Sequence, residues 1–416
     1  MLRQMSYKIE YNHKGKISGR FELPASKSIS NRVLIINALS GSDKSVANLA
    51  KCDDTDVMVK ALTSDSHLVD IGAAGTSMRF LTAYLSIQPG EWTITGSQRM
   101  KERPIQILVD ALRSIGADIE YAENEGFPPL KIRGKEIDGG DVEIDGSVSS
   151  QYISALMMIA PMLKKGLRIH LLNGVASVPY INLTLWIMNQ FGADASFSGN
   201  IIEVKPTKYK PIDYIVESDW TGASYWFQIA ALADVDEIFL PALFEKTMQG
   251  DGVLGDIFSH LGVSTEFADG GVKLRKTEVR EETGVFEWNF IDCPDLAQTV
   301  VVTCCVLNRK FRFTGLKSLK IKETNRILAL QQELKKFGYI LTEPEEGALE
   351  WNGEKCDEDA NISVDTYKDH RMAMAFAPIV LRHASFVVNE PEVVSKSYPD
   401  YWKEFGKIEG IKISNS

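Results

Sequence analysis

Residues 108–121, LVDALRSIGADIEY, hold the pattern that decides the fold: an apolar helix, a glycine that ends it, and an extended segment. The same pattern returns in three later segments, LTLWIMNQFGADASF at 183–197, VLGDIFSHLGVSTEF at 253–267 and LQQELKKFGYILTE at 330–343. The helix-ending glycines are separated by 76, 70 and 76 residues and stand at Gly116, Gly192, Gly262 and Gly338. Glycine at this point is the usual left-handed C-cap of a helix. The regular spacing indicates one α/β unit that is repeated along the chain.

Two weaker copies flank the four clear ones, at residues 28–72 and 372–406, which makes about six units. Units of this length are too long for a thin solenoid, and their arrangement over two cores suggests two domains of three units each. The alternative is that helix, glycine and strand recur by chance, because each is common. The fold class that we expect is therefore α/β, with two similar domains.

The domain boundaries are suggested by local composition. The proline-rich stretch 205–214 leads into YIVESDWTGASYWF, in which Asp219 or Thr221 can cap a new helix. The other boundary falls near Leu23 and Pro24, before the first basic helix. We therefore predict an inserted domain at 24–217 and a discontinuous domain formed by 1–23 and 218–416.

The composition limits the class of protein. The chain has 416 residues, of which 44% are hydrophobic and 25% charged, and its net charge is −10. The composition is ordinary for a globular protein. The negative net charge argues against a protein that binds nucleic acid mainly by neutralising its phosphates. No run of 18 apolar residues exists, so no membrane span is expected. The start lacks the apolar core of a signal peptide and the five cysteines form no C-x-x-C pair, so we expect a cytoplasmic protein.

Four apolar helices are expected to begin with lysine or arginine, at residues 26–39, 74–85, 322–338 and 369–381. A helix N-terminus carries partial positive charge and unpaired N–H groups, so acidic residues normally stand there. Several basic starts therefore suggest a bound anion, because a helix end plus a nearby cation suits phosphate or carboxylate.

Two motifs of the expected inserted domain carry such cations. ELPASKSISNR places Lys27, Ser28 and Arg32 around the first turns of a helix, and a solvated helix start is the alternative interpretation. IGAAGTSMR puts small residues, among them Gly75, before a helix that carries Arg79. Small residues let a backbone approach a ligand closely, although many strand–helix turns look alike.

Two further motifs add cations and hydroxyl groups. SQRMKERP packs Arg99, Lys101 and Arg103 into five residues, as an exposed charge run or as part of an anion site. GSVSSQ opens an apolar helix with three polar residues, Ser149, Ser150 and Gln151. Ordinary N-capping explains one serine, and the remaining polar groups favour a polyol or phosphate ligand.

Carboxylates appear among the C-terminal motifs. IDCPDLAQTV places Asp295 before an apolar helix, where an ordinary N-cap is the alternative. KETNR supplies Lys322, Glu323 and Arg326 in one helical turn, and its two cations repel each other unless an anion lies between them. A carboxylic acid held among cations is a candidate proton-transfer group. Two more cations follow in the DHRMAMAF and VVSKSYPDYW motifs, Arg371 and Lys396.

Taken in chain order, these motifs resemble one known family, the 5-enolpyruvylshikimate-3-phosphate (EPSP) synthases. The resemblance covers nearly the whole chain and is carried by LPASKSISNR, GAAGTSMR, RMKERP, GSVSSQ, SVPYINLT, the CPD segment, KETNR, DHRMA and SKSYPDYW. It implies two similar domains joined by two chain crossings, each an inside-out α/β barrel of three α/β units, with the active site in the cleft between them. The inserted domain would be the shikimate 3-phosphate side and the discontinuous domain the phosphoenolpyruvate side.

The resemblance also implies roles for individual residues. The residues that match shikimate 3-phosphate contacts are Lys27, Ser28, Arg32, Ser149, Ser150, Gln151, Ser177, Asp295 and Lys322. Those that match phosphoenolpyruvate contacts are Lys27, Gly75, Arg99, Gln151, Arg326, Arg371 and Lys396. Asp295 matches the family's proton acceptor and Glu323 its proton donor, and Lys27 is a third catalytic candidate. The sequence departs from the family's common pattern at Ala73, Phe80, Val178 and Ser318.

The implied reaction transfers the enolpyruvyl group of phosphoenolpyruvate to the 5-hydroxyl of shikimate 3-phosphate and releases phosphate. It proceeds by addition and elimination, on the route to chorismate and the aromatic amino acids. It needs no metal or organic cofactor, and the six histidines show no metal-ligand spacing. The family further implies glyphosate as an inhibitor, and we expect a monomer that binds neither nucleic acid nor membrane.

Two alternatives stay open at this point. An enolpyruvyl transferase acting on UDP-N-acetylglucosamine typically has a reactive cysteine in the loop occupied here by SQRMKERP, whereas no cysteine lies between Cys52 and Cys293. A catalytically silent anion-binding homologue would bind its ligands without turnover, although every expected acid, base and cation is present.

Overall fold

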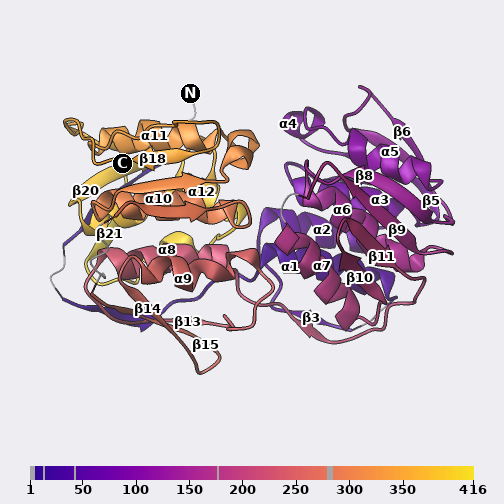
Figure 1. Cartoon of the computed structure of the whole chain (residues 1–416), viewed down its shortest axis with the longest axis horizontal. Coiled ribbons are helices and arrows are strands. Elements are labelled where there is room, and N and C mark those ends of the chain that lie inside the picture. Colours follow the sequence, from indigo (N-terminus) through magenta and orange to yellow (C-terminus); the bar gives the residue numbers. More distant parts are fainter. Residues whose placement is uncertain (1–4, 13–14, 42–43, 176–177, 279–283) are drawn as a thin grey trace. The chain divides into compact units, whose positions relative to one another are not determined.

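The computed structural model describes residues 5–12, 15–41, 44–175, 178–278 and 284–416. By its contacts the chain divides into two units, which we call the discontinuous unit, Met1–Pro24 with Ser218–Ser416, and the inserted unit, Ala25–Glu217. The chain therefore passes between the units twice, after Pro24 and after Glu217. Each unit has its own sheets and its own buried helices (Figure 1).

The inserted unit has three mostly buried helices that pack on one another, α1 (Lys27–Leu39), α3 (Gly75–Ser86) and α6 (Ser150–Ile159). One sheet runs in the order β4 (Leu68–Asp70), β5 (Gly90–Thr95), β7 (Leu130–Gly134) and β6 (Asp118–Tyr121). A second runs in the order β10 (Ala195–Ser198), β11 (Ile201–Val204), β9 (Leu167–Leu172) and β8 (Gly140–Asp145). The third pairs β12 (Tyr214–Ile215) with β3 (Val46–Ala47). The other helices are α2 (Asp53–Thr63), α4 (Gln98–Lys101), α5 (Gln106–Ser114) and α7 (Val178–Gln190).

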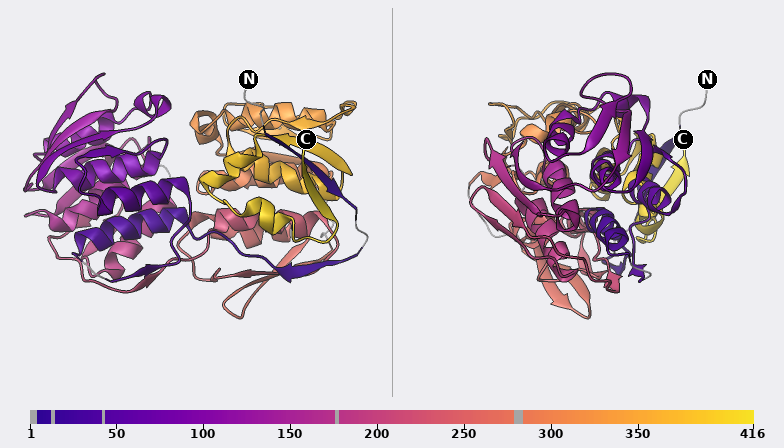
Figure 2. Two further views of the ribbon diagram at one scale, coloured as in Figure 1. Left: turned by 180° about the vertical axis from the view of Figure 1, so that it is seen from behind. Right: turned by 90° about the vertical axis from the view of Figure 1, so that its right-hand side faces the viewer.

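The discontinuous unit repeats this plan around α8 (Trp220–Leu232), α10 (Ala297–Val306) and α12 (His370–Phe376). Its first sheet runs β14 (Val263–Ala268), β15 (Gly271–Lys276), β13 (Val235–Pro241) and β2 (Ile17–Arg20). Its second runs β16 (Phe286–Asn289), β17 (Phe311–Thr314) and β18 (Leu349–Trp351). Its third runs β19 (Ser363–Val364), β20 (Ser385–Asn389), β1 (Ser6–Tyr11) and β21 (Ile411–Asn415), so that β1 and β21 lie side by side (Figure 2). The remaining α-helices are α9 (Leu254–Ser259), α11 (Arg326–Lys336) and α13 (Tyr401–Phe405).

The repeated element is a pair of parallel strands joined through a buried helix. β4 and β5 are joined through α3, β8 and β9 through α6, β16 and β17 through α10, and β19 and β20 through α12. A parallel pair needs such a crossover, and a helix that is apolar all round belongs in a core. α8 is buried along its whole length, for example. The predicted α/β fold class with repeated units is confirmed.

The four glycines behave as the sequence predicts. Gly116, Gly192, Gly262 and Gly338 have φ of 108°, 83°, 78° and 84°, the left-handed region that favours glycine. After three of them a backbone N–H reaches back into the helix that has just ended. These bonds run from Ala117 to Leu112, from Ala193 to Met188 and from Tyr339 to Leu334, at 3.0, 3.1 and 3.0 Å. Within the described residues, no helix is both long enough and apolar enough to cross a membrane.

Candidate active site

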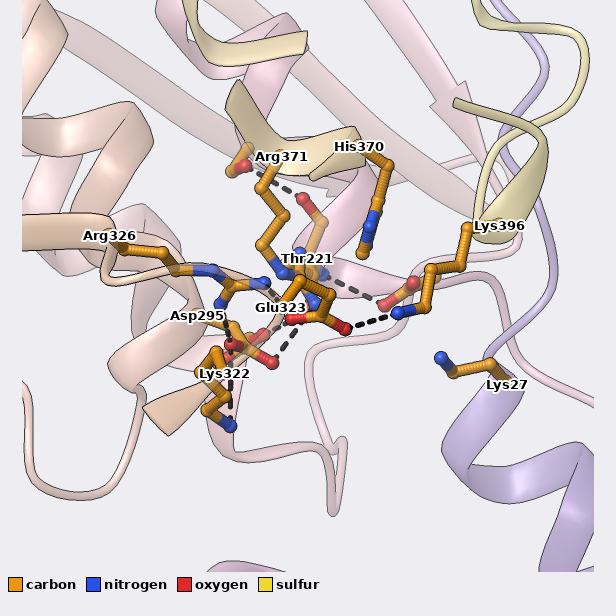
Figure 3. A network of polar contacts seen from close by, with 12 residues as sticks. Lys27, Thr221, Asp295, Lys322, Glu323, Arg326, His370, Arg371 and Lys396 are labelled. Carbon is orange, nitrogen blue, oxygen red and sulfur yellow. Dashed lines mark hydrogen bonds and ion pairs between the residues drawn. The ribbon is translucent and has the colours of Figure 1, made fainter. Parts of the chain in front are cut away.

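Arg326 is the centre of a buried ionic cluster in the discontinuous unit (Figure 3). Arg326 is 1% exposed, and its guanidinium group donates to three carboxylates. Nε bonds Asp369 Oδ2 at 2.7 Å, and Nη1 bonds Asp295 Oδ1 at 2.8 Å. Nη2 bonds Glu323 Oε2 at 2.8 Å. One planar cation therefore fixes the relative positions of both expected proton-transfer residues.

The cluster forms where helices of different repeats begin. Asp369 caps α12, because its side chain accepts from the Arg371 N–H at 2.9 Å. Asn325 caps α11 by accepting from the Leu328 N–H at 3.3 Å, which places Arg326 at the first helical position. Asp295 lies in the short turn Pro294–Leu296 that leads into α10. Carboxylates at such N-termini are favoured by the helix dipole.

Three further cations surround the two carboxylates. Arg371 Nη2 donates to Asp295 Oδ2 at 3.0 Å, and Lys322 Nζ lies 3.8 Å from Asp295 Oδ1. Lys396 Nζ donates to Glu323 Oε1 (Figure 3). The structure thus brings together all six residues that the sequence singled out in this part of the chain.

The electrostatic environment keeps both carboxylates charged. Burial alone would raise the pKa of Asp295, but Arg371, Lys322 and Arg326 together hold it well below its ordinary value. For Glu323, too, burial is outweighed, because Arg326, Lys396 and the His370 ring lower the pKa. In this state of the molecule both side chains are carboxylates, and neither holds a proton that it could donate.

Sequence reasoning missed one buried acid beside this cluster. Asp251, in the turn Gly250–Val253, is 5% exposed and accepts a hydrogen bond from the Thr221 hydroxyl. Burial and the charge of Asp295 raise the pKa of Asp251 to about 7. The expected cap of α8 is Asp219, which accepts from the Thr221 N–H at 3.0 Å.

The inserted unit holds its cations differently. Lys27 is the first residue of α1, and its Nζ donates to Asp54 Oδ2 at 3.1 Å. Asp54 is 4% exposed at the start of α2 and was not anticipated from the sequence. The acidic first turn of that helix, DDTD, is the signal that could have found it.

Arg32 lies one turn further along α1 and is 2% exposed. It donates to the hydroxyl oxygens of Thr184 at 2.7 Å and Ser154 at 3.1 Å, and to the Ser28 carbonyl at 2.8 Å. Its guanidinium carbon lies 5.3 Å from the centre of the Phe80 ring, one of the departures from the family pattern. Arg32 forms no ion pair with any residue that the structure describes, and burial lowers its pKa to about 10.

The remaining expected residues of this unit lie at two other helix starts and on a short helix. Gly75 opens α3, and Gln151 Nε2 donates to the hydroxyl of its neighbour Thr76 at 3.2 Å. Ser149 caps α6, with Ser150 and Gln151 in the first turn. Arg99 on α4 is exposed and pairs with Glu102 at 3.1 Å. Ser177 lies outside the described residues.

Two solved structures, both of enolpyruvyl transferases, share the fold of this chain. EPSP synthase from Acinetobacter baumannii has the same fold, with a TM-score of 0.77 at 20% identity over 99% of this chain and 100% of that one. The enolpyruvyl transferase NikO from Streptomyces tendae superposes with a TM-score of 0.72 at 12% identity, over 99% of this chain and 100% of that one.

The family model for EPSP synthase (3-phosphoshikimate 1-carboxyvinyltransferase) matches residues 11–66 and 63–405. The 3-phosphoshikimate 1-carboxyvinyltransferase of Bacteroides fragilis is 54% identical over 400 residues, 96% of this chain and 97% of that protein. The enzyme of the same name from Psychromonas ingrahamii is 35% identical over 424 residues, 94% of this chain and 97% of that protein. The chain belongs to the EPSP synthase family, and the predicted enzyme class, a transferase, is confirmed.

Proposed function

We propose that this protein transfers the enolpyruvyl group of phosphoenolpyruvate to the 5-hydroxyl of shikimate 3-phosphate and releases phosphate. The observation that carries the proposal is the Arg326 cluster, in which Asp295 and Glu323 are held at 2.8 Å from one guanidinium. The surrounding cations hold both carboxylates ionised before substrate binds.

In the addition step, the 5-hydroxyl oxygen bonds to C2 of phosphoenolpyruvate while C3 takes up a proton. Asp295 accepts the hydroxyl proton. It can do so because its low pKa keeps the carboxylate ionised in the empty site. In the elimination step, the bond from C2 to the phosphate oxygen breaks, phosphate leaves, and the methyl group returns a proton to the Glu323 carboxylate, which gave its own proton to C3 in the addition. Each positioned acid or base contributes about 100- to 10,000-fold to the rate.

Glu323 supplies the proton to C3 in this scheme. Its bonds to Arg326 and Lys396 hold it ionised before substrate binds. The carboxylate and phosphate of phosphoenolpyruvate compete for the same cations, so binding weakens those bonds and raises the Glu323 pKa toward its ordinary value. Substrate binding thereby prepares the acid.

The assignment of binding residues is part of the same proposal. The inserted unit, with Lys27, Ser28, Arg32 and the Ser149–Gln151 turn, binds shikimate 3-phosphate. Of the discontinuous unit, Lys322 binds shikimate 3-phosphate, and Arg326, Arg371 and Lys396 bind phosphoenolpyruvate. Glyphosate competes with phosphoenolpyruvate. The active protein is a monomer.

Phosphate release is the experiment that tests this function. We expect release only when both substrates are present, at an undiminished rate in excess EDTA. Omitting either substrate, and replacing shikimate 3-phosphate by UDP-N-acetylglucosamine, are the controls. Turnover with the nucleotide sugar would support the other enolpyruvyl transferase, and binding of both substrates without phosphate release would support a silent homologue.

A further inference from the structure

Two consecutive residues of the loop between β19 and α12, Tyr367 and Lys368, have a left-handed backbone. Their φ values are 53° and 57°, and no other two neighbours among the described non-glycine residues both have a positive φ. Residues with a side chain rarely adopt this conformation, so it persists only where the surrounding structure holds it. The loop leads directly into Asp369 and Arg371, two residues of the candidate active site. Whatever holds the loop therefore also decides where these two residues stand.

Glu333 on α11 is the residue that holds the loop. It is 0% exposed, and its two carboxylate oxygens accept hydrogen bonds from two points of the loop. Oε1 accepts from the Tyr367 hydroxyl at 2.6 Å, and Oε2 accepts from the Asp365 N–H at 3.0 Å. Lys336, further along the same helix, balances the charge, with its Nζ 2.7 Å from Glu333 Oε2. Hydrogen bonds to an ionised group are short and strong, so this carboxylate is a firm support.

The same helix also holds the far end of the loop. Arg326, the first residue of α11, donates from Nε to Asp369 Oδ2 at 2.7 Å and from Nη2 to Asp369 Oδ1 at 3.3 Å. Arg326 and Glu333 are two helical turns apart and lie on one face of α11. The Asp369 N–H closes the turn by donating to the Thr366 carbonyl at 2.8 Å. α11 therefore holds residues 365–369 at both ends and sets the start of α12.

We propose that Glu333 and Tyr367 are positioning residues for the proposed reaction, on which the inference rests. Their hydrogen bond keeps the left-handed turn in place, and the turn keeps Asp369 and Arg371 in their contacts. Within the part of the chain that the structure describes, neither side chain bonds to a residue of the Arg326 cluster, so both act through the backbone of the loop. Burial and the bond to Glu333 raise the pKa of Tyr367, so its phenol keeps the proton that it donates.

The first test is Tyr367→Phe, which removes the hydroxyl and keeps the ring. Because Arg371 is assigned to phosphoenolpyruvate, kcat/KM for phosphoenolpyruvate should fall about tenfold, within the range that a small displacement of a site residue costs. KM for shikimate 3-phosphate should change less than about twofold. The matched control is Tyr209→Phe in the inserted unit, which removes a buried hydroxyl that donates to the Met158 carbonyl at 2.9 Å. Phosphate release gives the kinetic constants, and urea unfolding gives the stability of both variants.

A bond that only stabilises the fold would give a different result. It would lower the stability of both variants and leave kcat/KM of the folded protein unchanged in both. The proposal requires a loss for phosphoenolpyruvate in Tyr367→Phe alone. It is overturned if Tyr367→Phe keeps its kcat/KM, or if Tyr209→Phe shows the same loss.

The second test relieves the backbone strain. Lys368 is exposed, and glycine adopts a positive φ at little cost, so Lys368→Gly should leave kcat/KM within about twofold of the wild type. In the Tyr367→Phe background, the same change should raise kcat/KM for phosphoenolpyruvate about threefold, because the turn then needs less support. If the double variant shows no recovery, the bond does not act by holding the turn and the proposal fails.

The third test is a double-mutant cycle on the bond itself. Glu333→Gln keeps the shape of the side chain and removes the charge that strengthens the bond, so it should also lower kcat/KM for phosphoenolpyruvate. Combined with Tyr367→Phe, the two losses should be clearly less than additive, because both act on one interaction. Additive losses would show that the two residues act independently and would overturn the proposal.

Calorimetric titration of phosphoenolpyruvate into the full chain separates failure of this proposal from failure of the proposed function. A wild type that binds phosphoenolpyruvate but releases no phosphate contradicts the function. The Kd then still decides the positioning role: binding about tenfold weaker in Tyr367→Phe than in the wild type supports it, and unchanged binding overturns it.

Discussion

Arg326 and Arg32 are buried to almost the same degree, 1% and 2% exposed, yet their surroundings are opposite. Arg326 donates to three carboxylates, and although burial alone would lower its pKa, Asp369, Asp295 and Glu323 raise it. Arg32 is held by two hydroxyls and one carbonyl, and burial lowers its pKa to about 10. Carboxylates inside the protein thus balance the charge of Arg326, whereas no carboxylate among the described residues pairs with Arg32, to which the proposed function assigns a ligand anion.

The largest effect is expected where the acids of the Arg326 cluster lose their proton-transfer ability. Asp295→Asn and Glu323→Gln keep the shape of each side chain, so each should lower turnover by about 100- to 10,000-fold while shikimate 3-phosphate binding stays mostly intact. Phosphate release gives the turnover and calorimetry gives the binding. Asp292→Asn, an exposed neighbour in the same loop, is the control. Lost binding with unchanged turnover per bound complex would make both residues structural.

The two arginines themselves offer the second test of the comparison. Arg326→Met leaves three carboxylates without their partner and should lower the free energy of unfolding by about 3–5 kcal/mol. Arg32→Met should cost far less, because the Thr184 and Ser154 hydroxyls already lie 2.9 Å from each other and stay hydrogen-bonded. It should nevertheless abolish shikimate 3-phosphate binding. Urea unfolding and calorimetry measure the two quantities, and equal destabilisation would refute the contrast.

Asp251, beside the Arg326 cluster, should make the free energy of unfolding depend on pH. Its pKa is about 7 in the folded protein, above its ordinary value of 3.8, so the folded state binds the proton more tightly. The stability that this proton contributes is complete below about pH 4 and is lost as the pH rises through 7. Asp251→Asn accepts the same Thr221 hydrogen bond without titrating.

The variant should therefore gain stability over the wild type as the pH rises, on the order of 2 kcal/mol between pH 5 and pH 8. Thermal unfolding across that range measures the difference. Asp256→Asn, which changes an exposed acid on α9, should show no such trend. A constant difference between Asp251→Asn and wild type at all pH values would mean that Asp251 does not titrate in this range.

The same comparison explains what the sequence could predict. Helix-ending glycines, apolar helices and motif cations act locally, so the repeats and the residues on α1, α3 and α11 could be predicted from the chain alone. The partners of the cations could not, because Asp54 lies 27 residues from Lys27 and Asp369 lies 43 residues from Arg326. Asp251 stands 30 residues from Thr221 and belongs to no recognised motif. Only the packing of repeats decides which cation receives a carboxylate.

The smallest effect is expected at Arg99, which is paired like Arg326 but exposed like a surface residue. The side chains of Arg99 and Glu102 are 75% and 52% exposed, so Glu102→Gln should change the free energy of unfolding by less than about 0.5 kcal/mol. The change frees Arg99 for phosphoenolpyruvate and should lower its KM by at most about twofold, an effect that high salt removes by screening. Glu136→Gln, which breaks the exposed pair with Lys164, is the matched control and should leave KM unchanged. If Glu102→Gln destabilised the protein as much as Arg326→Met, exposure would not separate the two kinds of arginine pair. If Glu102→Gln lowered the KM equally at high salt, the effect would not be electrostatic.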